Sequence, residues 1–119
     1  MIWYVALGSA LGGMVRYVLS GWVQRAAGGV FPVGTLVVNV AGSLLIGFLL
    51  RYFLEGPTLS VEMRTLLTIG FCGGFTTFST FSYETVALLQ SGQWTRAGLY
   101  AFSSLGLTVG ATFAGLIVT

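Results

Sequence analysis

Residues 70–82 have the sequence GFCGGFTTFSTFS, and this stretch decides how the rest of the chain is interpreted. Two adjacent glycines followed by two β-branched threonines make poor helix, so we predict a helix break between Gly73 and Thr77. A broken helix at membrane depth is tolerated only where its free backbone lines a cavity or is buried in protein. The freed carbonyl oxygens are ligands for hard cations, and two such breaks on a dimer axis could share one small cation.

Phenylalanines follow this break at every third position, beside several hydroxyl side chains. They are Phe75, Phe78 and Phe81. The edge of an aromatic ring is electropositive, so ring edges can face an anion that hydroxyl and amide groups also solvate. The alternative is that these rings face lipid or pack in the protein core, as most phenylalanines in membrane proteins do.

The composition places this motif in a membrane protein. Hydrophobic residues make up 55% of the 119 residues, charged residues only 7%, and the mean hydropathy is +0.93. Soluble domains carry about 25% charged residues, so this chain has too few to cover a water-facing surface. The net charge of +2 is too small for a nucleic-acid footprint. A single cysteine and the absence of histidine exclude a disulfide framework, a Cys/His metal site and a Ser-His-Asp triad. We therefore expect no enzyme.

The hydrophobic stretches divide into four spans. A membrane helix needs about 20 apolar residues, and turn residues such as Gly28, Pro57 and Gly92 mark the boundaries. The expected spans are 3–23, 33–53, 64–90 and 95–118. They fill the chain, so we predict an all-α integral membrane protein with one four-helix domain over residues 1–119, the third helix broken near its middle.

The arginines indicate no single orientation in the membrane. Arg51 and Arg64 flank the second loop, whereas Arg25 and Arg96 flank the first and third loops. This even division gives the positive-inside rule almost no signal. It favours dual topology and an antiparallel homodimer, although the insertion machinery or a partner could still fix one orientation.

Pairs of small residues provide packing faces for such helices. The pairs are Gly8 and Gly12, Gly70 and Gly74, and Gly106 and Gly110. Each allows helix backbones to approach closely, either between chains or within one four-helix bundle.

Polar residues recur every four positions in two spans, which places each set on one stripe of its helix. The stripes are Thr35, Asn39, Ser43 and Gly47, and Tyr100, Ser104, Thr108 and Thr112. An intramembrane asparagine is costly without a partner and indicates a functional site, so we assign function to Asn39 and Ser104. For Ser43 and Thr112 we favour interhelical hydrogen bonding.

Two charged residues lie within or at the end of a span. Arg16 could extend its guanidinium to the membrane surface, or it could bias a nearby vestibule towards anions. Glu84 is either a helix-end anchor or a polar partner.

Three segments together resemble the Fluc/CrcB-type fluoride channels of microbes. They are GGMVRY at 12–17, GTLVVNVAGS at 34–43 and GFCGGFTTFSTF at 70–81. The resemblance covers essentially the whole chain. It implies an antiparallel dual-topology dimer in the cell membrane, with two pores and a central structural sodium ion. It also implies passive export of fluoride, which protects the cell from fluoride toxicity.

The same resemblance implies roles for individual residues. Phe78 and Phe81 correspond to the ring pair that lines the pores, and Asn39 corresponds to the pore amide. Gly73 and Thr76 correspond to the residues whose carbonyls hold sodium. The polar track on the last helix corresponds to Tyr100, Ser104 and Thr108.

Two other functions remain to be weighed. A small dual-topology multidrug exporter needs a carboxylate within the bundle to exchange protons for a cationic drug. Here the acidic residues Glu55, Glu62 and Glu84 all lie at span ends, which counts against an exporter. A purely structural subunit would have no need of Asn39 or of a broken helix.

Overall fold

A computed structural model describes residues 1–56 and 59–118, and its regular elements are all helical. Three helices are long and apolar enough to cross a membrane: α1 (Ile2–Ala27), α2 (Val33–Glu55) and α6 (Trp94–Val118). The expected turn at Pro57 and the chain end at Thr119 lie outside the described residues. The start of each helix agrees with the expected spans to within one residue, but α1 and α2 extend further at their C-terminal ends.

The segment between α2 and α6 consists of four helical pieces. They are α3 (Val61–Thr65), the π-helix η1 (Leu66–Cys72), α4 (Gly73–Phe75) and α5 (Phe78–Gln90). The first three follow one another without interruption. The only residues between α4 and α5 are Thr76 and Thr77, whose backbones are extended (φ −93°, ψ 158° and φ −150°, ψ 120°).

The break is therefore narrower than the range from Gly73 to Thr77 predicted from the sequence. Gly73 is helical, with φ −63° and ψ −40°, and the chain leaves the helix only at the two threonines. Gly74 is also helical, and the position requires glycine because a Cβ atom there would overlap the backbone of Ser9 on α1. β-branched threonines adopt extended backbone readily, so they supply the break while the glycines supply close packing.

The first two glycine pairs act within the chain, and the third does not. Cβ atoms on Gly8 or Gly12 would overlap carbonyl oxygens of η1, so these glycines let α1 lie directly against the broken segment. A Cβ atom on Gly106 or Gly110 would meet no atom within 4 Å. The close approach of α2 to α6 uses Gly47 and Gly115 instead.

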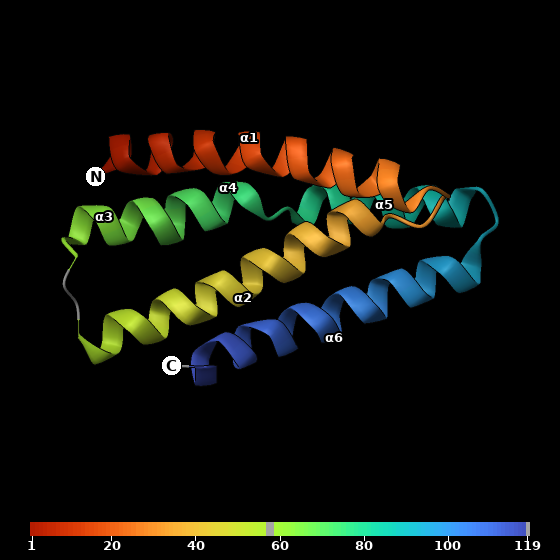
Figure 1. Ribbon diagram of the computed structural model, residues 1–119. Helices are drawn as coiled ribbons and strands as arrows, with labels where there is room; N and C mark the ends of the chain where they lie inside the picture. Colours follow the sequence, from red (N-terminus) through yellow and green to blue (C-terminus); the bar gives the residue numbers. More distant parts are fainter. Residues whose placement is uncertain (57–58, 119) are drawn as a thin grey trace.

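The helices form an elongated bundle of 50 × 29 × 22 Å (Figure 1). α1 lies along the α3–α5 segment, α2 crosses the middle of the bundle, and α6 packs mainly on α2 at the other edge. Large apolar side chains cover much of the outside, among them Trp3, Phe102 and Phe113. This outer surface is suited to lipid.

Candidate functional site

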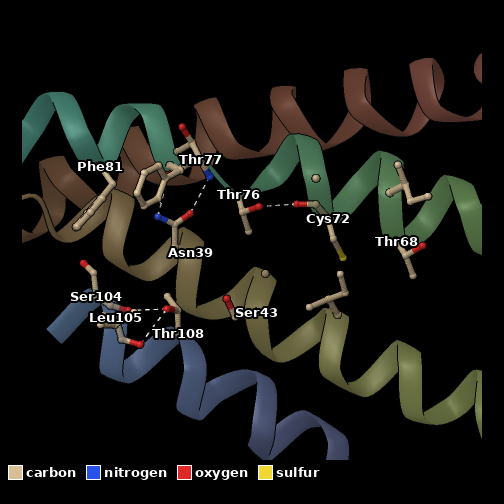
Figure 2. A pocket seen from close by; sticks show the side chains of 15 residues that line it. Asn39, Ser43, Thr68, Cys72, Thr76, Thr77, Phe81, Ser104, Leu105 and Thr108 are labelled. Atoms are coloured by element: carbon tan, nitrogen blue, oxygen red, sulfur yellow. Dashed lines mark hydrogen bonds between the residues drawn. The ribbon is translucent and has the colours of Figure 1, made fainter. Parts of the chain in front are cut away.

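A groove of about 520 Å³ opens between α2, α6 and the segment that contains the break (Figure 2). Most of the site residues predicted from the sequence line it: Asn39, Gly73, Thr76, Phe78, Phe81, Ser104 and Thr108. Further uncharged residues complete the lining, among them Ser43, Thr68 and Cys72. No lining residue carries a charge. A ligand in this groove would be solvated by hydroxyl, amide, carbonyl and ring-edge groups alone.

Asn39 is hydrogen-bonded to the extended backbone at the break. The Thr77 N–H donates to Asn39 Oδ1 at 2.8 Å, and Asn39 Nδ2 donates to the Thr77 carbonyl oxygen at 3.1 Å (Figure 2). Asn39 Oδ1 thus replaces the carbonyl acceptor that the Thr77 N–H would have in a continuous helix, and Nδ2 supplies a donor to the Thr77 carbonyl. One N–H of Nδ2 remains for a ligand, because a side-chain amide has two donor hydrogens. Asn39 therefore shapes the break as well as lining the groove.

Thr77 also begins the helix that follows. Its Oγ1 accepts a hydrogen bond from the Thr80 N–H at 3.2 Å, which is the N-cap arrangement for α5. The Thr77 side chain and backbone thus fix the start of α5. Through this start they fix the direction of the phenylalanine pair.

The rings of Phe78 and Phe81 lie with their centroids 5.5 Å apart and inclined at 41°. Phe81 packs against Tyr100, with centroids 5.1 Å apart, whereas Phe78 is 78% exposed. The pair therefore reaches from the core of the bundle to its open side. In this single chain, Phe78 has no protein surface to pack against on that side.

Ser104 provides a hydroxyl without a partner. The residue is 6% exposed, and its Oγ atom is buried and makes no hydrogen bond within the described residues. Thr108 Oγ1, by contrast, donates to the Ser104 carbonyl oxygen at 2.6 Å. A buried polar group without a partner costs free energy unless a ligand or water satisfies it. Because Ser104 also lines the groove, its hydroxyl is a candidate donor to a ligand or water there.

Tyr100 does not line the groove. It is fully buried behind Phe81, and its hydroxyl donates to Glu84 Oε1 at 2.8 Å. Of the two roles considered for Glu84, the structure supports that of a polar partner. A carboxylate near the end of a membrane span was the available signal, but the sequence did not identify Tyr100 as its partner.

Arg16 does not extend to the membrane surface. Its Nε donates to the Gly74 carbonyl oxygen at 3.2 Å, at the C-terminal end of α4. A cation is favoured at a helix C-terminus, where free carbonyls give a partial negative charge. Arg16 thus stabilises the end of the helical segment that precedes the break, on its α1 side.

The carbonyls predicted to bind a cation differ from their neighbours in their hydrogen bonds. Arg16 binds the Gly74 carbonyl and Asn39 binds the Thr77 carbonyl. No hydrogen bond within the described residues engages the carbonyls of Gly73 and Thr76. The described residues also contain no cluster of His, Cys, Asp or Glu that could hold a metal ion. A cation at the break would therefore have to be held by backbone oxygens, which suit a hard cation.

Fold and groove together define a helical integral membrane protein with an uncharged, mostly apolar groove at a helix break. Residues 3–116 match the family model described as CrcB-like protein, Camphor Resistance (CrcB). The chain is 56% identical over 111 residues to the fluoride-specific ion channel FluC of a Thermus thermophilus strain, covering 93% of this chain and 87% of that protein. It is 50% identical over 113 residues to the channel of the same name from Syntrophotalea carbinolica, covering 95% and 90%. The chain belongs to the CrcB-like family.

Proposed function

We propose that this protein is a fluoride-selective ion channel that exports fluoride passively and protects the cell from fluoride toxicity. It is a multi-pass protein of the cell membrane and not an enzyme, as its relatives are named ion channels. The observation that carries the proposal is the buried Ser104 hydroxyl, which has no partner within the described residues and lies in an uncharged groove with Asn39 and Phe78.

The chemistry of the groove suits a small anion. An anion that leaves water loses its hydration energy, which the protein must replace with several donors. The groove offers the Ser104 hydroxyl, the remaining Asn39 N–H and the ring edges of Phe78 and Phe81. No charged side chain lines the groove, so no side-chain cation holds the anion too tightly for release. Chloride is larger, so it would meet a steric cost in the same site and gain weaker hydrogen bonds.

The broken segment supplies the fourth membrane crossing in this proposal. Each of its pieces is short, but residues 61–90 together are long enough to span a hydrocarbon core of roughly 30 Å. The break then lies within the membrane. It is stabilised there by Arg16 on one side and Asn39 on the other.

An antiparallel homodimer would complete the site. The groove is open on one side, and Phe78 projects from it into a space that the chain does not fill. A second copy covering this side would enclose the groove, and the two copies would then form two pores. The even division of arginines between the two membrane surfaces supports opposite orientations.

A sodium ion on the dimer axis is the proposed structural cofactor. The carbonyls of Gly73 and Thr76 have no hydrogen-bond donors within the described residues, and the groove that both residues line contains no carboxylate. Carbonyls from both copies could then share one ion. Its role would be to hold the two breaks together, so we expect it to exchange slowly.

The functional test is protection of cells that lack their own fluoride export system. Expression of this protein should restore growth in fluoride, and Ser104→Ala should abolish the protection because it removes a donor from the groove. Ser103→Ala is the matched control, since the Ser103 hydroxyl bonds back to the Leu99 carbonyl on its own helix. Equal protection by Ser104→Ala and the unmodified protein, at equal expression, would contradict the proposed site.

The exporter alternative receives no support from the groove. Proton-coupled exchange of a cationic drug needs a carboxylate in the path, and the groove lining contains none. Glu84 is hydrogen-bonded to Tyr100 behind Phe81. Uptake of a lipophilic cation driven by a proton gradient should therefore not exceed that of protein-free liposomes.

A further inference from the structure

A second groove lies on the outer face of α1, apart from the site at the helix break. It has a volume of about 470 Å³ and is lined by apolar side chains only: Met14, Val15, Val18, Leu19 and Trp22. α1 forms one edge of the bundle and α6 lies at the opposite edge (Figure 1). The α1 groove therefore does not belong to the site that contains Asn39 and Ser104.

Arg25 lies at the end of this α1 groove. Met14, Val18, Trp22 and Arg25 are separated by steps of four, four and three residues, which places them on one face of the helix. Arg25 Nη1 lies against Gly21, one turn earlier on α1 at the edge of this face.

Arg25 has no partner within the described residues, unlike the arginines near it in the fold. It is exposed and makes no hydrogen bond or ion pair there. At the same end of the bundle, Arg96 donates to Gln93 Oε1 at 2.7 Å. Arg16, further along α1, donates to Gly74. The Arg25 guanidinium thus has no acidic side chain beside it, and only the C-terminal end of α1 acts on its charge.

The α1 groove has the length of one bilayer leaflet. Met14 lies at the middle of α1, and Arg25 lies eleven residues later, near its C-terminal end. At 1.5 Å per residue this is a rise of roughly 16 Å, about half of a hydrocarbon core of roughly 30 Å. The α1 groove therefore runs from the bilayer centre to one interface. Trp22 stands near that interface, where tryptophans commonly anchor membrane helices.

We propose that the α1 groove binds an anionic phospholipid, with one acyl chain along Met14–Trp22 and the phosphate at Arg25. A guanidinium pairs well with phosphate oxygens, and a cation without an acidic partner favours a lipid with net negative charge over a zwitterionic one. A second copy of the chain is the less suitable occupant. Packing protein over this face would bury Arg25 without a partner, which is costly.

The test measures lipid retention by native mass spectrometry of the full-length protein. The detergent-solubilised protein is incubated with equal amounts of phosphatidylglycerol and phosphatidylcholine of the same chain length. We expect phosphatidylglycerol to be retained preferentially, and Arg25→Gln to reduce its retention about fivefold. Arg96→Gln is the control: it removes an exposed arginine at the same end of the bundle and should leave retention unchanged.

A second variant examines the apolar part of the α1 groove. Val18→Trp should fill it and lower the retention of both lipids, without changing the oligomeric state. Equal retention of the two lipids by the unmodified protein would overturn the proposal. Equal losses in Arg25→Gln and Arg96→Gln would overturn it too, as they indicate general attraction by surface charge. Loss of the oligomer in Val18→Trp with unchanged lipid retention would assign the α1 groove to a second copy.

Discussion

Asn39 and Thr77 are joined by two hydrogen bonds across the groove, from the Thr77 N–H to Oδ1 at 2.8 Å and from Nδ2 to the Thr77 carbonyl at 3.1 Å. This pairing connects α2 to the helix break over 38 residues of sequence. It holds the backbone extended at the point where α4 ends and α5 begins. The geometry of the Phe78–Phe81 pair therefore depends on a side chain from another helix.

Asn39→Asp should lower fluoride flux at least tenfold. The carboxylate keeps the acceptor for the Thr77 N–H but places an oxygen against the Thr77 carbonyl, where the amide donated. Loss of a hydrogen bond that leaves a polar group unsatisfied costs about 1–3 kcal/mol when the group is buried and less at this half-buried site, and an ionised carboxylate would also repel the anion. Flux is measured in proteoliposomes with a fluoride electrode. Ser103→Ala is the control and should retain most of the flux, because Ser103 lies outside the groove lining and its hydroxyl bonds back to the Leu99 carbonyl.

Phe78→Ile and Phe81→Ile should each lower fluoride flux sharply, because isoleucine keeps apolar bulk but has no ring edge. The two variants should differ in stability. Phe81 packs on Tyr100, so Phe81→Ile should lower the free energy of unfolding by about 1 kcal/mol through the lost aromatic contact. Phe78 is exposed in the separated chain, so Phe78→Ile should change this free energy little. Thermal unfolding and flux are measured together. Phe102→Ile is the control, because Phe102 is 76% exposed and lies outside the groove lining. Unchanged flux in both Phe78→Ile and Phe81→Ile would assign these rings to packing.

Removal of sodium should weaken the dimer. Replacing sodium with a large organic cation throughout purification should reduce activity or the dimeric fraction, because the carbonyls of Gly73 and Thr76 would lose their shared ligand. Size-exclusion chromatography with light scattering gives the dimeric fraction, and restored sodium should recover it. If exhaustive sodium removal changes neither quantity, no structural sodium site exists at the break.

Fixing the orientation of the chain tests the antiparallel arrangement. Two or three lysines added to the second loop, near Arg51 and Arg64, should trap the chain in one orientation by the positive-inside rule. Such a chain expressed alone should lose fluoride transport. Co-expression with a chain that carries the lysines in the first and third loops should restore it. Normal transport by one fixed-orientation chain alone would reject the antiparallel dimer.

Much of the architecture could be predicted from the sequence, because membrane spans are long apolar stretches and the break has unusual composition. The position of the break could not be resolved within Gly73–Thr77. Both residue types disfavour helix, and only the structure shows that the glycines stay helical, with Gly74 packed against Ser9.

The groove residues on α2 and α6 could be predicted from their four-residue spacing, but their partners could not. Nothing local indicates that the Asn39 amide pairs with Thr77 or that Arg16 bonds to Gly74. Tyr100 has the same spacing as Ser104, yet it is buried behind Phe81 and bonded to Glu84. Spacing places residues on a helical stripe. How far along that stripe a groove extends depends on the neighbouring helices.

The central claim is that this protein conducts fluoride and excludes chloride, and fluoride efflux from proteoliposomes tests it most directly. Vesicles loaded with potassium fluoride are diluted into fluoride-free buffer. Valinomycin is added so that potassium leaves with the anion and no membrane potential stops the efflux. A fluoride electrode records the released fluoride. We predict rapid fluoride release and, in matched vesicles loaded with potassium chloride, no chloride release above that of protein-free vesicles. Chloride release as fast as fluoride release, or fluoride release no faster than from protein-free vesicles, would contradict the account.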